Sequence, residues 1–212
     1  LTWQADMSFA ATMLWRLTGM DQYQKDAYSY LDRDSYSLEI PSIGILAAAD
    51  LCGAIGHDAI KDIKMHQLSC DILQSAANKA IITATEDNLP WGTPGYMAWG
   101  QLGFNGGQGS IIALAKRVNL ISDATVAVRA RDWLLGLNPW GNSFIVGFGV
   151  NSPTTPYHWA SVFGAGLPKG AVVGGPASIT ALARVKAMVP KKEQFDSDRA
   201  IYCKKADYYA TS

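Results

Sequence analysis

The stretch DWLLGLNPWGNSFIVGFG, residues 132–149, decides the fold of this chain. It begins inside a predicted helix, which Ser122 or Asp123 can cap because a short side-chain oxygen accepts hydrogen bonds from free backbone N–H groups. Apolar residues recur on one face of that helix, namely Val126, Ala130, Trp133, Leu134 and Leu137. Gly136 and Pro139 end it, and the glycines and prolines that follow flank apolar and aromatic residues. This composition predicts a long ordered loop, and such loops usually carry function.

The segment from 134 to 176 resembles the C-terminal signature of glycoside hydrolase family 9, the inverting cellulases. The family pattern runs leucine-leucine-gly-x-asn-pro-x-gly-x-ser, then an aromatic residue, valine and gly-aromatic-gly-x-asn-x-pro. Later come pro-his-his-arg and a leucine-rich turn into gly-gly-pro. The chain matches it at residues 134–143, 146–149, 151, 153, 156, 167 and 174–176. Weaker similarity covers most of the chain, including the segment 3–19 and the pair Trp99-Gly100.

The composition is that of an ordinary globular domain. The 212 residues are 49% hydrophobic and 17% charged, which is enough for one well-buried domain over residues 1–212. Its 18 basic and 18 acidic side chains cancel, so we expect no nucleic-acid partner. No apolar run reaches the ~20 residues of a membrane span, so we expect no membrane-spanning segment. The chain starts at Leu1 without a secretion leader, and we expect it to be a mature or shortened piece of a longer protein.

The three cysteines are Cys52, Cys70 and Cys203, and none forms a Cys-x-x-Cys pair. This spacing indicates neither a disulfide framework nor a zinc site. We expect buried thiols, with one disulfide as the alternative, and we assign no metal site and no cofactor. His57 and His66 are interpreted as helix-surface residues.

The rest of the chain predicts helices in succession, so the expected fold class is all-α. The predicted helices cover residues 3–19, 21–31, 43–55, 58–80, 109–118 and 122–137. Phe9, Met13 and Leu17, with Ala10 and Leu14 beside them, form the apolar stripe of the first helix, and the glycine-rich residues 106–110 are expected to open the fifth. Helices in pairs predict an α/α toroid. The resemblance implies an (α/α)6 barrel with a cleft at one end, of which this chain would be the C-terminal portion.

Inverting hydrolysis of a glycosidic bond requires two carboxyl groups ~6.5–9.5 Å apart, one as general base and one as general acid. The resemblance implies that the base is an aspartate upstream of Leu1. It implies that the acid is a glutamate in a C-terminal pattern with two aromatic residues. Placing Tyr202 and Tyr209 on those aromatic positions puts the glutamate just after Ser212. We therefore assign no catalytic carboxylate within the chain, and Asp198 and Asp207 are interpreted as exposed charges.

Substrate binding is expected at the end of the signature loop. Tyr157 and Trp159 stand where the family has a histidine and an arginine, His158 stands at the second histidine, and Lys204 replaces an aspartate. The candidate substrate-binding residues are Tyr157, His158, Trp159, Trp99, Tyr209, Trp91 and Tyr96. Aromatic rings can stack on sugar faces, although helix-end packing is an equal alternative for Trp91, Tyr96 and Trp99. For His158 a surface or structural role is the alternative, and Trp140 is expected to pack in the core.

The resemblance implies a secreted hydrolase that cleaves β-1,4-glucan with inversion and has a β-linked glucan as its partner. The alternative is a non-catalytic carbohydrate-binding or structural member of the same barrel family. A second rival is another α/α-toroid enzyme, such as a polysaccharide lyase. Calcium is implied by the resemblance only, because no Asp-x-Asp loop is present to predict a site.

Overall fold

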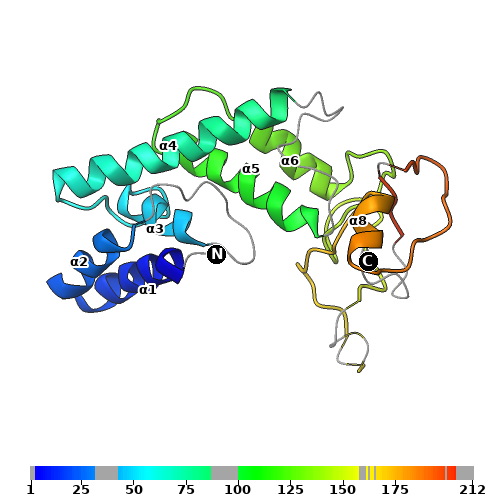
Figure 1. The fold of residues 1–212 in the computed structure, drawn as a ribbon, viewed down its shortest axis with the longest axis horizontal. Helices are drawn as coiled ribbons and strands as arrows, with labels where there is room; N and C mark the ends of the chain where they lie inside the picture. Colours follow the sequence, from blue (N-terminus) through cyan, green and yellow to red (C-terminus); the bar gives the residue numbers. More distant parts are fainter. Residues whose placement is uncertain are drawn as a thin grey trace. The chain divides into compact units, whose positions relative to one another are not determined.

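The computed structural model describes residues 3–31, 43–86, 100–157, 161, 163–164, 166–198 and 200–203. Within these residues the regular elements are α-helices, and β-pairing is limited to isolated bridges (Figure 1). The helices are α1 Trp3–Thr18, α2 Asp21–Ser29, α3 Gly44–Leu51, α4 Ile63–Glu86, α5 Gln101–Arg117, α6 Thr125–Leu135 and α8 Ile179–Arg184. None of the helices in the described part combines the length and apolarity that a membrane crossing requires.

The chain divides into two compact units. The first comprises Leu1–Asn88 and Gly107–Ala127, and the second comprises Leu89–Gly106 and Val128–Ser212. Helices α5 and α6 therefore contribute residues to both units.

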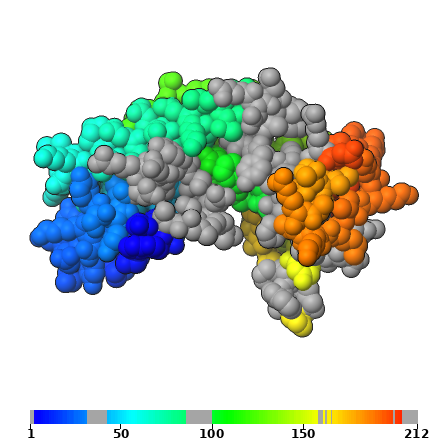
Figure 2. Space-filling model, viewed as in Figure 1, coloured from blue at the N-terminus to red at the C-terminus, as the bar shows by residue number. Residues whose placement is uncertain are grey.

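In the first unit, α1 packs against α2 and α3, and its buried residues are small, whereas Phe9 and Trp15 are partly buried against the core. The atoms of α1 and α2 form one continuous surface in Figure 2. The buried residues of α1 are Ala5, Ser8, Ala11 and Thr12. Leu14 and Leu17 of the predicted stripe are 42% and 82% exposed, so the prediction of a buried stripe was wrong for them. Small side chains allow close helix approach, and the Ser8 hydroxyl is satisfied by the Ala27 carbonyl at 2.9 Å.

Helices α3, α4 and α5 supply most of the core of the first unit. Alanines and branched aliphatic residues alternate there, including Ala47, Ala48, Leu51, Leu73, Ala76, Ala77, Ile111 and Ile112. Helix α5 begins at Gln101, so the glycine-rich residues 106–110 lie inside the helix and do not open it as predicted. Gly106 has no side chain, and the Cδ1 of Leu134 lies 3.6 Å from the position that a Cβ would take there. Tertiary contact thus overrides the low helix propensity of glycine at this position.

The start of α6 follows the sequence prediction. The Asp123 carboxylate accepts hydrogen bonds from the hydroxyl of Thr125 at 2.6 Å and from its backbone N–H at 2.8 Å. These bonds favour the ionised form and hold the pKa of Asp123 below its ordinary value. Val126, Ala130 and Trp133 are buried as expected, whereas Leu137 lies beyond the helix and is 65% exposed.

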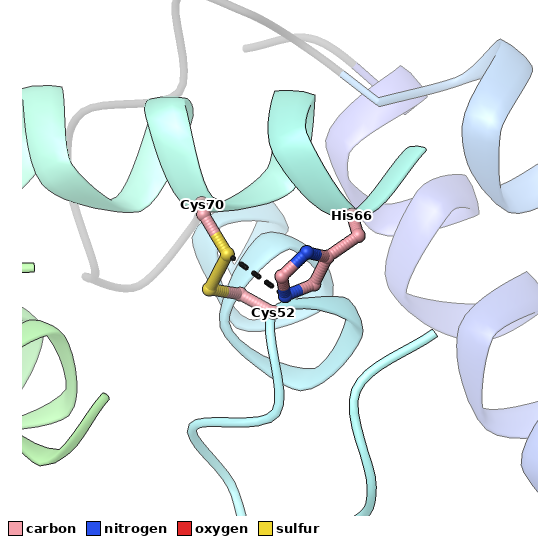
Figure 3. Close-up of side chains that lie close together, drawn as sticks. All are labelled: Cys52, His66 and Cys70. Atoms are coloured by element: carbon pink, nitrogen blue, oxygen red, sulfur yellow. Dashed lines mark hydrogen bonds between the residues drawn. A yellow bond between two sulfur atoms is a disulfide. The ribbon is translucent and has the colours of Figure 1, made fainter. Parts of the chain in front are cut away.

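Cys52 and Cys70 form a disulfide that joins the end of α3 to α4 (Figure 3). The expectation of free buried thiols was therefore wrong for this pair, and the alternative of one disulfide is the observed state. Cys203 is not part of a disulfide and is half-buried. The two bonded residues are 18 positions apart in sequence, and local periodicity carries no information about such a pairing.

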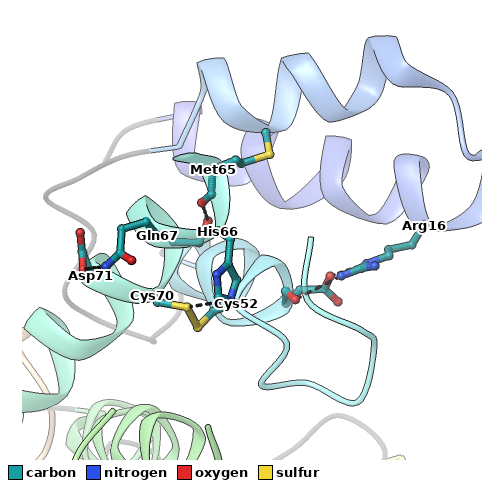
Figure 4. Close-up of a disulfide and its surroundings, with 9 residues drawn as sticks. Arg16, Cys52, Met65, His66, Gln67, Cys70 and Asp71 are labelled. Atoms are coloured by element: carbon teal, nitrogen blue, oxygen red, sulfur yellow. Dashed lines mark hydrogen bonds and ion pairs between the residues drawn. A yellow bond between two sulfur atoms is a disulfide. The ribbon is translucent and has the colours of Figure 1, made fainter. Parts of the chain in front are cut away.

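The buried carboxylate of Asp50 joins α1 to α3, and Figure 4 labels its partner Arg16 together with the disulfide. Asp50 is fully buried, and its oxygens lie 2.6 Å from the Arg16 Nε and 2.6 Å from the His57 Nδ1. Arg16 also donates to the backbone carbonyls of Asp50 and Asp58, at 3.2 and 2.8 Å. His57 lies in the loop after α3, so its interpretation as a helix-surface residue was wrong; it is a partner of the buried carboxylate.

Candidate functional site

The signature loop, residues 136–157, folds back onto the end of α6. The carbonyls of Leu134 and Leu135 have no partner within the helix, because the helix ends there. The Leu134 carbonyl accepts from the Phe144 N–H at 2.9 Å, and the Leu135 carbonyl accepts from the Val150 N–H at 3.1 Å. The loop therefore completes the hydrogen bonding of the helix end and is fixed by it.

Side-chain amides hold the middle of the signature loop. Asn138 is buried, and its Nδ2 donates to the carbonyls of Trp133 at 2.9 Å and Asn142 at 2.7 Å. Asn151 Nδ2 donates to the Gly141 carbonyl at 3.1 Å. These bonds give the asparagines of the signature pattern a structural role, because buried backbone groups of a loop require partners.

Gly149 is required by a close approach within the loop. Its φ is +74°, and a Cβ there would lie 2.5 Å from the Leu135 carbonyl oxygen and 2.8 Å from the Ser143 side chain. A residue with a side chain would meet both a strained backbone and a steric clash.

Three buried aromatic side chains, Trp133, Phe144 and Tyr202, form the core at the loop, and the partly buried Trp140 packs against them. Tyr202 packs edge-on against Phe144 with ring centroids 5.0 Å apart and against Trp140 at 6.0 Å. The Asp196 carboxylate accepts from the indole N–H of Trp140 at 2.7 Å and from the backbone N–H of Tyr202 at 3.2 Å. The expectation that Trp140 packs in the core is confirmed, and Tyr202 lies directly against the signature loop.

Burial of Tyr202 raises the pKa of its hydroxyl well above the ordinary value. Desolvation disfavours the phenolate, and the neighbouring Cys203 acts in the same direction. The ring therefore stays neutral and serves as a packing residue at the start of the C-terminal pattern.

The Gly-Gly-Pro segment also packs within the second unit. Ile145 pairs with Val172 in an antiparallel bridge, and the Val173 N–H donates to the Phe144 carbonyl at 3.0 Å. Just beyond, the Pro176 carbonyl accepts from the Gln101 Nε2 at 3.0 Å. Backbone pairing therefore holds the segment just before Gly-Gly-Pro against the middle of the signature loop.

Of the predicted substrate-binding residues, the structure describes Tyr157, which is 50% exposed at the end of the signature loop. The other predicted residues, His158, Trp159, Trp99, Tyr209, Trp91 and Tyr96, lie outside the described residues, as do Lys204 and Asp207. Their grouping at one cleft stays a prediction. Asp198 forms an exposed ion pair with Lys192 at 2.5 Å, which agrees with its interpretation as a surface charge.

Sequence reasoning missed two groupings of polar side chains in the first unit. One is the contact of His66 with the Cys52–Cys70 disulfide, where His66 Nε2 lies 3.4 Å from the Cys70 Sγ. The spacing of four residues between His66 and Cys70 places both on one helix face and could have indicated it. The other is a cavity of about 350 Å³ between α2 and the start of α4, lined by Asp21, Gln24, Lys25, Tyr28, Asp62, Lys64 and Met65.

Comparison with known proteins identifies the family of the chain. The model of glycosyl hydrolase family 9 matches residues 2–209. The chain belongs to this family. A 27-residue stretch, 13% of the chain and 5% of its relative, is 67% identical to Endoglucanase 8 of Oryza sativa subsp. japonica.

Solved structures of family 9 members share the fold. A metagenome-derived family 9 endoglucanase matches 98% of this chain at 20% identity with a TM-score of 0.71. An endoglucanase from the termite Nasutitermes takasagoensis matches 100% of it at 21% identity with a TM-score of 0.63. The chain spans 37% of the first structure and 47% of the second.

These matches confirm the expected fold class, an all-α chain that forms part of the (α/α)6 barrel of family 9. The coverage agrees with the prediction that the chain is the C-terminal portion of such a barrel, and the chain belongs to a family of glycoside hydrolases.

Proposed function

We propose that the whole protein cleaves β-1,4-linked glucan with inversion of configuration, and that this chain forms the C-terminal part of its catalytic domain. The observation that carries the proposal is the family match over residues 2–209, which includes both the signature loop and most of the C-terminal pattern. The name of the rice relative, an endoglucanase, supports a glucan as the substrate class.

The local structure supports a substrate role for the end of the signature loop. The loop is fixed by hydrogen bonds to the end of α6, so Tyr157 is carried by an ordered scaffold and is half-exposed. A phenol can stack on a sugar face and exchange a hydrogen bond with a sugar hydroxyl. His158 and Trp159 follow Tyr157 directly, and we assign all three to the sugar subsites with Trp99, Tyr209, Trp91 and Tyr96.

The aromatic core under the loop supports the expected position of the general acid. Tyr202 begins the C-terminal pattern and packs against Phe144 and Trp140 of the signature loop. Tyr202 and Tyr157 belong to the same compact unit, which supports a general acid in the unit that also carries the proposed sugar contacts.

We also propose that the protein is exported from the cell. The Cys52–Cys70 disulfide supports this, because disulfides form and persist mainly in oxidising compartments.

The decisive experiment is an assay of the full-length protein on a soluble β-1,4-glucan. We expect release of reducing sugar, with the new chain end appearing first as the α anomer in NMR spectra recorded before mutarotation. Inversion produces this anomer because water attacks from the face opposite the leaving group. Initial release of the β anomer would contradict the mechanism.

Variants of Tyr157 test the substrate-binding role. Tyr157→Phe removes one hydrogen bond, and we expect kcat/KM to fall by about threefold to tenfold. Tyr157→Ala also removes the ring and should lower it further. Asp198→Asn is the matched control, because Asp198 belongs to an exposed ion pair and its loss should leave kcat/KM unchanged.

A second candidate function is non-catalytic binding of glucan. It is favoured by the tyrosine, tryptophan and lysine at positions 157, 159 and 204, where the family pattern has histidine, arginine and aspartate. Neither tyrosine nor tryptophan replaces the five-donor fork of an arginine. Retention of the protein on immobilised β-1,4-glucan without release of reducing sugar would favour this function.

A further inference from the structure

Two sulfur atoms and one imidazole nitrogen meet at the junction of α3 and α4. Cys52 directly follows the last residue of α3, whereas His66 and Cys70 lie one turn apart on the same face of α4. The Sγ atoms of Cys52 and Cys70 and a ring nitrogen of His66 all lie within 4.8 Å of one another. Figure 3 shows the His66 ring turned toward the disulfide.

We propose that this cluster is a redox-gated zinc site, in which the reduced chain binds Zn²⁺ through Cys52, Cys70 and His66 and the disulfide form does not. Two thiolates and one imidazole are a common donor set for zinc, and water would occupy the fourth position of the tetrahedron. The proposal is independent of the catalytic function proposed above.

The geometry of the cluster is close to that of a tetrahedral zinc site. Zinc bonds of ~2.3 Å to sulfur and ~2.05 Å to nitrogen at the tetrahedral angle place the sulfur and nitrogen about 3.6 Å apart. The His66 Nε2 lies 3.4 Å from the Cys70 Sγ, so this pair is already in place. The same bonds place two sulfurs about 3.8 Å apart, which requires the Cys52 and Cys70 side chains to separate after reduction.

Burial and charge also suit a metal ion. Cys52 and Cys70 are 4% and 7% exposed, so two thiolates there would be shielded from water. An unpaired buried charge is costly, and a divalent cation neutralises both thiolates at once. His66 is half-buried, which leaves the third donor on the side of the cluster that reaches solvent.

The exchange between the two states balances as a thiol–disulfide reaction with a small-molecule disulfide as oxidant. The Cys52 and Cys70 thiolates lose two electrons in total and form their S–S bond through a mixed disulfide. The oxidant's own S–S bond breaks, its two sulfurs accept those electrons and two protons from water, and Zn²⁺ leaves as the hydrated ion. A dithiol reductant reverses the reaction.

The test measures zinc bound to the full-length protein after equilibrium dialysis against Zn²⁺. One sample is oxidised, and the other is reduced by a phosphine and freed of reductant without air. We expect the reduced protein to hold one more zinc ion per chain than the oxidised protein. Oxidised glutathione should release that ion as the disulfide forms again.

Variants separate this cluster from other zinc-binding groups. His66→Gln should weaken the additional site by about tenfold or more, and Cys70→Ser should abolish it. Cys203→Ser is the matched control, because it removes a thiol outside the disulfide and should leave the additional zinc ion in place. Circular dichroism without metal checks that each variant is folded. If Cys70→Ser does not fold, His66→Gln still tests the site, because it keeps both cysteines.

Cobalt substitution gives a second readout. Co²⁺ bound by two thiolates in the reduced protein should show a sulfur-to-cobalt charge-transfer band, and Cys70→Ser should weaken it. Equal zinc content in the oxidised and reduced proteins, or unchanged zinc affinity in His66→Gln, would overturn the proposal.

Discussion

Gly149 shows how one residue of the signature pattern is required by the fold. Its φ is +74°, and the Leu135 carbonyl oxygen would lie 2.5 Å from an added Cβ. Gly141 has a φ of +59° and no heavy atom within 4 Å of its Cβ position. The two glycines share the left-handed backbone but differ in the space around them.

Gly149→Ala is therefore expected to lower the free energy of unfolding by about 2 kcal/mol or more, since strain and a clash act together. Gly141→Ala should have a smaller effect, because it meets only the backbone strain. Urea unfolding of both variants, followed by tryptophan fluorescence, measures the difference. Equal losses in the two variants would show that the close approach at Gly149 is not important for stability.

At the scale of elements, the buried Asp50 carboxylate forms a polar link between α1 and α3 through Arg16. The Arg16 side chain is 17% exposed and that of Asp50 is fully buried, so the pair is largely shielded from water. Removing one partner of such a pair leaves a buried charge without full compensation.

Arg16→Met keeps the apolar stem and removes the cation, and we expect it to lower the free energy of unfolding by about 3 kcal/mol. The matched control is Arg131→Met, because Arg131 pairs with Asp132 at the surface with 63% of its side chain exposed. The loss there should be less than about 1 kcal/mol. Urea unfolding followed by far-ultraviolet circular dichroism measures both, and similar losses would contradict the role of the Asp50 link.

At the scale of the whole molecule, the chain forms part of a family 9 barrel, and we expect its two catalytic carboxyl groups to lie outside residues 1–212. It spans 37% of the metagenome-derived endoglucanase and 47% of the termite enzyme. The base is expected upstream of Leu1 and the acid after Ser212, so the two carboxyl groups of an inverting hydrolase are expected outside residues 1–212.

Residues 1–212 expressed alone are therefore expected to release no reducing sugar from soluble β-1,4-glucan, in contrast to the activity that we propose for the full-length protein. Circular dichroism of the short chain provides the control for helix content. Hydrolysis by the folded short chain would require a carboxylate within residues 1–212 and would contradict the assignment of the two catalytic residues.

The sequence by itself determined the features that depend on near neighbours. Asp123 caps α6 through Thr125, two positions away. In the signature loop, Asn138 donates to a nearby backbone carbonyl and the glycines adopt left-handed backbone conformations. Such local requirements leave a recognisable pattern of residue types, so the loop, the family and the helical fold class could all be predicted. The start of α5 could not be predicted, because packing compensates for the low helix propensity of the glycines within this helix.

Tertiary structure decided which residues meet across the fold. The sequence placed Leu14 and Leu17 on a buried stripe, but both are exposed, and the buried residues of α1 are Ala5, Ser8, Ala11 and Thr12. Cys52, His66 and Cys70 meet because α3 packs on α4, and Asp50 gains Arg16 because α1 packs on α3. The physical reason is that periodicity identifies an apolar face but does not encode which surface covers it. The disulfide and the buried ion pair become visible only when the helices are assembled.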